Sequence, residues 1–84
     1  MRVLLYTEEY AKEDILAAEP AKSLDYDDPV KAVLEGTHLM DGVEYKSALL
    51  TMDDGTPKAY YWWNYKINRH GAQRFYDADV ALEN

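Results

Sequence analysis

The residues that could carry out chemistry in this 84-residue chain are few and widely spaced. Its two histidines, His38 and His70, stand apart from any nucleophile pattern, and catalysis needs a base within hydrogen-bond reach of a nucleophile. We therefore expect structural roles for both, with His38 at the start of a strand and His70 in a turn. The chain has no cysteine, which excludes disulfides, cysteine-ligated metals and thiol catalysis, and fits a reducing cytoplasm.

Carboxylates are the other candidates for catalysis or metal binding. The run Asp25-Tyr26-Asp27-Asp28 resembles the opening of a calcium-binding loop, but it lacks the glycine and glutamate that such a loop needs further on. Asp77 and Asp79 share one face of an expected strand, where ion pairing across strands is more typical than acid–base catalysis. The glycines are too scattered for a phosphate-binding loop. We therefore expect a protein that is not an enzyme and that holds no cofactor or metal.

Residues 58–67 hold both tryptophans and three of the eight tyrosines. Successive side chains of a strand point to opposite faces, so this segment divides into two sets. The wholly apolar and aromatic set is expected in the core: Tyr61, Trp63, Tyr65 and Ile67. The mixed set is expected to face solvent or a partner: Tyr60, Trp62, Asn64 and Lys66.

The second set admits two uses. Bases stack on exposed aromatic rings while lysine and arginine follow the phosphates, so single-stranded nucleic acid could bind Tyr60, Trp62, Lys66, Arg69 and Arg74. Tyrosine and tryptophan are also the usual anchors of protein interfaces. Because the net charge of −7 opposes nucleic-acid binding, a protein interface is favoured, either with a larger protein or as a homodimer through the aromatic face.

The charge of the chain is segregated. Residues 1–45 carry eleven acidic and four basic residues, whereas residues 46–84 carry five of each. Carboxylates spaced along the first half can imitate the phosphates of a nucleic acid and so dock on a basic groove, although a solubilising surface is the simpler interpretation. The residues predicted to contact a partner in this way are Glu8, Glu9, Glu13, Asp14, Asp25 and Asp27.

The elements that would position these groups follow from local pattern. Residues 3–6 predict a strand, and a helix over residues 8–18 is expected to end before Pro20. A loop over residues 21–27 follows. The pair Asp28-Pro29 then predicts the start of a second helix, which Gly36 is expected to end.

From residue 37 the pattern becomes strand-like. The pair Asp41-Gly42 predicts a tight hairpin, and two further turns are expected at residues 53–56 and 68–71, before a last strand over residues 73–82. We therefore predict one domain of residues 1–84 with an α+β fold. It would be an antiparallel β-sheet meander of four to five strands, with one or two short N-terminal helices packed on one face and the other face open.

The overall character of the chain is small, acidic, cysteine-free and rich in aromatics, without a catalytic signature or an apolar run that could span a membrane. In this it resembles small phage-encoded proteins that bind and block a host factor, of which anti-CRISPR proteins are one group. The resemblance implies an inhibitor that acts in the host cytoplasm and competes with nucleic acid at a basic site on a larger protein. The alternative is a small sheet-based protein that binds single-stranded nucleic acid.

Overall fold

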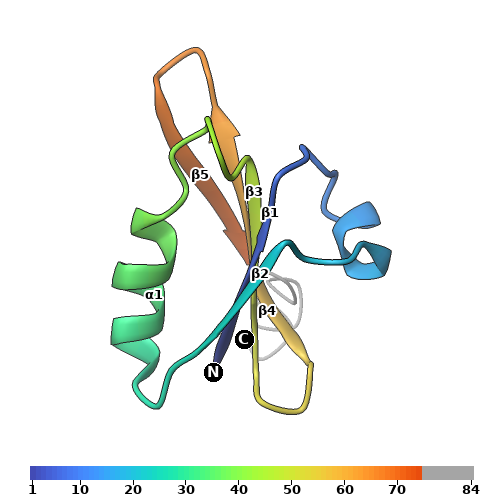
Figure 1. Ribbon diagram of the computed structural model, residues 1–84, viewed down its shortest axis with the longest axis vertical. Coiled ribbons are helices and arrows are strands. Elements are labelled where there is room, and N and C mark those ends of the chain that lie inside the picture. The colour runs from blue at the N-terminus through green and yellow to red at the C-terminus, as the bar shows by residue number, and fades with distance from the viewer. Residues whose placement is uncertain (75–84) are drawn as a thin grey trace, which may run out of the picture.

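The computed structural model describes residues 1–74, and its central feature is a five-stranded antiparallel sheet (Figure 1). The strands are β1 (Arg2–Tyr6), β2 (Lys22–Asp25), β3 (Ser47–Thr51), β4 (Pro57–Asn64) and β5 (Arg69–Arg74), in the order β2-β1-β3-β4-β5. One α-helix, α1 (Pro29–His38), and one 3-10 helix, η1 (Asp14–Ala17), accompany them. The predicted α+β fold with an antiparallel sheet is thereby confirmed. Strands β3 to β5 form the meander, while α1 carries the chain from β2 across β1 to β3.

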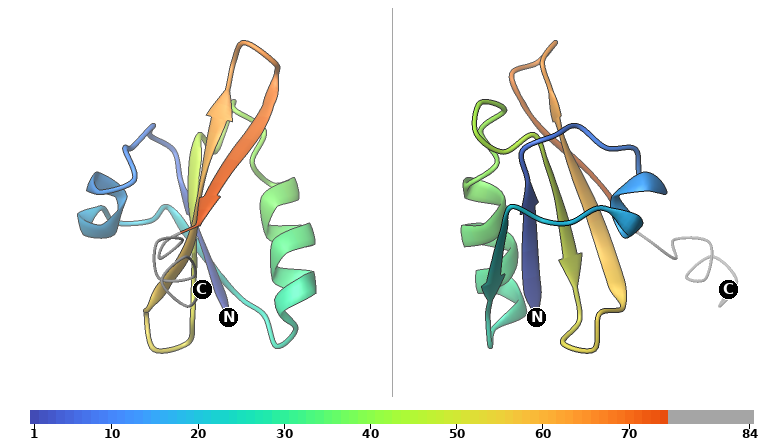
Figure 2. Two further views of the ribbon diagram at one scale, coloured as in Figure 1. Left: turned by 180° about the vertical axis from the view of Figure 1, so that it is seen from behind. Right: turned by 45° about the vertical axis from the view of Figure 1, so that its right-hand side comes forward.

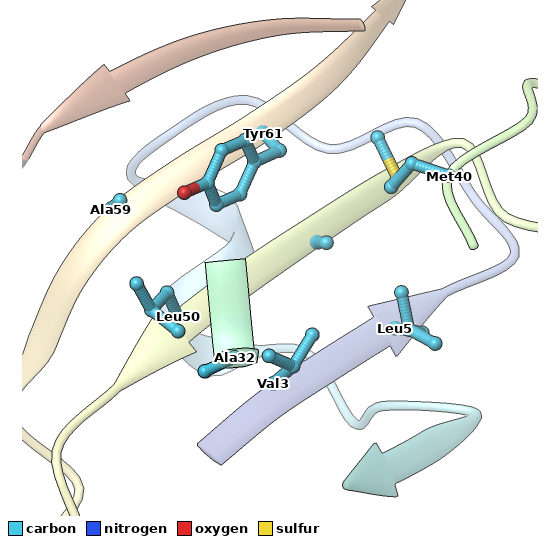
Figure 3. Packing of buried hydrophobic residues seen from close by; sticks show 8 residues of the cluster. Val3, Leu5, Ala32, Met40, Leu50, Ala59 and Tyr61 are labelled. Carbon is cyan, nitrogen blue, oxygen red and sulfur yellow. The ribbon is translucent and has the colours of Figure 1, made fainter. Parts of the chain in front are cut away.

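Helix α1 covers one face of the sheet. It starts as predicted, with Pro29 at the first position and the Asp28 carboxylate accepting a hydrogen bond from the Val30 amide at 2.9 Å. Figure 3 shows the core on this side, which joins Ala32 and Met40 to the sheet residues Val3, Leu5, Ala48, Leu50, Ala59 and Tyr61.

Gly36 does not end this helix, as the sequence predicted, because α1 continues to His38. The glycine instead allows the helix to approach β1 closely. A Cβ at this position would lie 2.6 Å from a methyl carbon of Val3. The glycine is therefore required by packing and not by the end of the helix.

The opposite face of the sheet is not open, and here the prediction was wrong. Residues 8–18 form no continuous helix, and the segment that contains η1 lies across this face (Figures 1 and 2). Ile15 is fully buried there against Tyr6, Leu49 and Tyr60, which makes a second core. Covered on both faces, the central strand β3 has no exposed residue.

Residues 22–25, predicted as a loop, form the edge strand β2, which pairs with β1 from Arg2↔Asp25 to Leu5↔Lys22. Both faces of this strand are largely exposed, so its sequence shows no alternation of apolar and polar residues. The predicted turn at residues 53–56 is confirmed between β3 and β4, with Gly55 at φ +94°. The end of the predicted last strand, with Asp77 and Asp79, lies outside the described residues.

Two other turns differ from the prediction. The pair Asp41-Gly42 does not join two strands, because α1 runs to His38 and the next strand begins only at Ser47. The Asp41 carboxylate there accepts hydrogen bonds from the backbone amides of Val43 and Glu44, both at 2.9 Å. The third turn comes earlier, at residues 65–68, so His70 lies in β5 and not in a turn.

Candidate functional site

Two side-chain hydrogen bonds hold residues 8–10 against the sheet. The hydroxyl of Ser47, fully buried on β3, donates to the carbonyl oxygen of Glu8 at 2.7 Å. The hydroxyl of Tyr60 on β4 donates to the carbonyl oxygen of Tyr10. Glu9 lies between these two anchors, so the backbone that carries its carboxylate is held on both sides.

These anchors also explain why residues 8–18 are not a helix. An isolated helix of this length is marginally stable in water, and its stability in a protein depends on packing. Here the carbonyl oxygens of Glu8 and Tyr10 accept hydrogen bonds from the sheet, and Ile15 reaches the core from a single 3-10 turn. Tertiary contacts therefore override the helix-forming composition of the segment.

Trp62 provides the accessible aromatic surface on this face. Its ring stacks on Tyr60, with the ring centroids 5.6 Å apart and the planes inclined by 19°. Opposite it on β5 is Gly71, where a Cβ would come within 2.5 Å of the indole. Tyr60 is only 7% exposed and Trp62 is half-buried. The buried Tyr60 ring thus packs against the indole, and Trp62 is the ring that a partner can reach.

Trp62 borders two open hollows in the surface. The first, of about 440 Å³, is lined by Ala11, Lys12, Glu13, Tyr60 and Trp62. The second, of about 420 Å³, is lined by Glu9, Trp62, Trp63, Asn64, Tyr65 and Lys66. Trp63, whose indole lies against Gly42, is set apart. The other charged and aromatic residues that line the two hollows are called the Trp62 patch: Glu9, Lys12, Glu13, Tyr60, Trp62, Tyr65 and Lys66.

Two carboxylates act on the tyrosine of the stacked pair. Burial raises the pKa of the Tyr60 hydroxyl above its usual value of 10.0, and the negative charges of Glu9 and Glu13 raise it further. Residues 7–20, which cover this face, carry five acidic residues and one lysine. The acidic and aromatic features that occupy separate halves of the sequence therefore meet at one place in the fold.

The structure brings most of the predicted contact residues together. Glu9, Glu13, Tyr60, Trp62 and Lys66 all belong to the Trp62 patch. Glu8 and Asp14 are exposed on the same segment, each next in sequence to a carboxylate of the patch.

Asp25 and Asp27 lie apart from these residues. Asp25 ends β2, three strands away from β4, which corresponds to roughly 14 Å at the usual spacing of strands. Its carboxylate accepts a hydrogen bond from the Arg2 guanidinium at 2.8 Å. Asp27 is exposed in the connection between β2 and α1. One contact surface that includes every predicted acidic residue would have to extend across the sheet.

Two residues of the patch, Lys12 and Tyr65, were not predicted from the sequence. The alternation places Tyr65 and Ile67 in the core, yet they are 56% and 58% exposed, because β4 ends at Asn64 and the chain turns. The two asparagines that flank this turn could have indicated it. The Asn64 side chain accepts a hydrogen bond from the Lys66 amide at 3.0 Å, and Asn68 adopts φ +53°. Both features are typical of asparagine in turns.

Trp63, also predicted in the core, is only half-buried. Its indole lies against Gly42, where a Cβ would come within 2.4 Å of the ring. His38 is exposed at the end of α1, and His70 is exposed on β5 with its ring edge-on to Tyr61 at 6.0 Å between centroids. Within residues 1–74, no group of three histidine, aspartate or glutamate side chains is placed to hold a metal ion.

Comparisons with known protein families, with curated proteins and with solved structures give no match for this chain. In the part of the chain described here, no helix is long and apolar enough to cross a membrane. What the site does must follow from its own geometry. An accessible indole on a stacked tyrosine, with a carboxylate in each adjoining hollow, suits the non-covalent binding of a positively charged surface.

Proposed function

We propose that this chain is a non-enzymatic binding protein that occupies a basic surface on a larger protein through the Trp62 patch. The observation that carries the proposal is the position of Glu9 and Glu13 beside the Tyr60–Trp62 stack. Aromatic side chains near the centre of an interface supply much of its binding energy, and the charges around them steer the encounter.

The order of the patch before binding supports this function. The Trp62 ring is held by the stack with Tyr60 and by the close approach of Gly71, so little side-chain freedom would be lost when a partner covers it. The backbone on both sides of Glu9 is hydrogen-bonded to the sheet. A partner would therefore meet a surface whose main groups are already in place.

The tip of the β4–β5 hairpin extends this surface. Figure 1 shows the hairpin projecting beyond the other strands, and its turn carries the exposed side chains of Tyr65 and Ile67. The Tyr65 hydroxyl donates to the carbonyl oxygen of Gly42 at 3.4 Å, which ties the tip to the loop that follows α1. Exposed apolar groups next to an aromatic anchor are typical of protein-binding surfaces.

The mechanism would be competition. If the basic surface of the partner normally binds nucleic acid, this protein would block it sterically and would present carboxylates where phosphates otherwise lie. Phage-type inhibitors of host factors, with anti-CRISPR proteins among them, form the class that this mode of action fits, and the host cytoplasm is where such a protein would act.

Binding of single-stranded nucleic acid is the second candidate, because Lys66 lies in one hollow with the accessible Trp62. Glu9 lines the same hollow and opposes it. The two functions predict opposite changes in affinity for one substitution. Lys66→Gln should weaken stacking on an oligonucleotide by removing a phosphate contact, whereas it should strengthen binding to a basic protein by removing a repulsion.

The test is affinity capture from a lysate of the host cells, followed by calorimetry with the purified partner. The tag is kept off the N-terminus, because the terminal amino group donates to the Tyr26 carbonyl at 2.9 Å and to the Asp53 carboxylate at 2.6 Å. The double variant Glu9→Gln/Glu13→Gln should weaken binding about tenfold and flatten its salt dependence.

The matched control is Glu35→Gln/Glu44→Gln, which changes the net charge equally at two exposed residues outside the patch. This control should leave the affinity within about threefold of the wild type. Equal effects of the two double variants would show that net charge alone drives binding and would refute the proposed site. Recovery of nucleic acid in place of a protein would favour the second candidate.

The predicted homodimer stays a separate prediction. Tyr60 is buried beneath the segment that contains η1, so two copies would have to meet through Trp62 and the hairpin tip. Light scattering during gel filtration measures this directly, and a dimer that dissociates in Trp62→Ala would place the contact at the indole.

A further inference from the structure

We infer that the Trp62 patch contains a subsite for a single arginine side chain of the partner, whose guanidinium lies over the Trp62 indole between the carboxylates of Glu9 and Glu13. This inference rests on the proposed function and names the side chain that the site selects.

The two glutamates line different hollows, and Trp62 borders both of them. Glu13 lines the hollow that Trp62 shares with Tyr60, and Glu9 lines the second hollow, toward Asn64 and the hairpin tip. A flat cation over the indole, which borders both hollows, would therefore have one carboxylate on each hollow to approach. A compact cation in either hollow would reach only one of them.

Arginine meets this geometry better than lysine does. The guanidinium is planar, stacks on aromatic rings and offers five N–H donors in a fixed fork, whereas an ammonium is a strongly hydrated point charge. Tryptophan is the best of the aromatic side chains for such a contact with a cation. Hydrogen bonds from a guanidinium to carboxylates add strength and fix its orientation.

Each hollow also contains a lysine, Lys12 in the first and Lys66 in the second. Their charges reduce the attraction for a second cation. The negative charges of Glu9 and Glu13 nonetheless act at the Tyr60 hydroxyl, whose pKa they raise in addition to the larger effect of burial. Removal of the exposed Lys66 charge should therefore raise the affinity for arginine. A gain in affinity from the loss of a side-chain charge is a specific test of the inference.

The experiment compares two blocked tripeptides of equal charge, acetyl-Gly-Arg-Gly-amide and acetyl-Gly-Lys-Gly-amide, titrated into the isotope-labelled full chain. Nuclear magnetic resonance should show the arginine peptide shifting the Trp62 indole N–H and the amides of Gly71 and residues 9–13. The δ-methylene protons of the peptide arginine should move upfield under the ring current of the indole. We expect a dissociation constant of roughly 1–10 mM for arginine and binding at least about fivefold weaker for lysine.

Variants locate the subsite within the patch. Glu9→Gln/Glu13→Gln should weaken the binding of the arginine peptide about fivefold, Glu35→Gln/Glu44→Gln should leave it unchanged, and Lys66→Gln should strengthen it. Trp62→Ala should abolish the upfield shift, and the spectrum of the free variant reports whether it is folded. Trp62→Phe keeps a ring at this position and should retain a smaller shift.

Equal binding of the two peptides, or an upfield shift that survives in folded Trp62→Ala, would overturn the inference. Its failure is distinguishable from failure of the proposed function. A captured partner that depends on Glu9 and Glu13, together with peptides that bind alike, would leave the function standing without the subsite. A selective arginine peptide, with no partner that depends on the patch, would leave the subsite standing without the function.

Discussion

The two faces of the sheet are closed by different means. On one face α1 packs its small residues Ala32 and Gly36 against the sheet, and its backbone hydrogen bonds are made within the helix. On the other face the covering segment has a single 3-10 turn (Figure 2). This segment depends on donors from the sheet, the hydroxyls of Ser47 and Tyr60.

This difference shows how a small fold can separate stability from binding. A regular helix covers its face by packing alone. An irregular segment must have its backbone groups bonded elsewhere, and those bonds fix its exposed side chains relative to the strands beneath. Glu9 is held beside Trp62 in this way, which fits the common pattern of binding groups on a loop that a rigid scaffold positions.

The largest expected effect comes from the core under the irregular segment. Ile15→Ala removes a fully buried side chain and should lower the free energy of unfolding by about 2–4 kcal/mol, measured by urea denaturation. The control is Leu16→Ala, since Leu16 is 52% exposed and its loss should change stability by no more than about 0.5 kcal/mol. A small loss at Ile15 would mean that this face is not closed by packing as the helical face is.

On the helical face, Gly36→Ala should lower the free energy of unfolding by about 1–3 kcal/mol, because the new methyl group would overlap Val3. The direction of this change in stability is informative, because replacing glycine by alanine at an exposed helix position raises the free energy of unfolding by about 1 kcal/mol. The double variant with Val3→Ala, which itself truncates a core residue, should lose less stability in thermal denaturation than the sum of the two single variants. Strict additivity of the two changes would contradict the contact as the cause.

A smaller effect is expected at the link between the irregular segment and the sheet. Tyr60→Phe leaves the Tyr10 carbonyl without its donor and should lower the free energy of unfolding at neutral pH by about 0.5–1.5 kcal/mol. It should also broaden the resonances of residues 8–10. An unchanged stability together with unchanged resonances would show that the hydrogen bond does not hold the segment.

The same variant should respond differently to alkaline pH. The pKa of Tyr60 is raised in the folded protein, so its protonated hydroxyl stabilises the fold fully below the unfolded value near 10.0, and this stabilisation is lost as pH rises through the folded pKa. Stability in Tyr60→Phe should therefore fall less steeply above pH 10.0. Tyr6, whose pKa burial also raises, keeps its own contribution in both proteins.

Local pattern predicted those elements whose signals are local. The capping pair Asp28-Pro29 marks the start of α1, and the turn with Gly55 separates β3 from β4 as predicted. The edge strand β2 could not be predicted, because a strand that is exposed on both faces has no alternation to detect. The end of β4 was missed because its aromatic alternation continues through Tyr65 into the turn.

The sequence predicted the residues of the candidate site as two separate groups. Pattern and charge singled out Trp62 and Lys66 in one half of the chain and Glu9 and Glu13 in the other, as two separate surfaces. Their meeting depends on hydrogen bonds between residues 39 and 50 positions apart in sequence, which no local pattern encodes.

By itself the sequence determined the α+β class, the antiparallel sheet and the types of side chain available for binding, because these depend on composition, turn residues and short periodicities. Only the tertiary structure decided which face each group occupies, that Tyr60 is covered while Tyr65 is exposed, and that Glu9 and Glu13 line hollows beside Trp62. The physical reason is that a short segment of marginal helical stability takes the conformation that best satisfies the sheet it covers, and that choice rests on contacts distant in sequence.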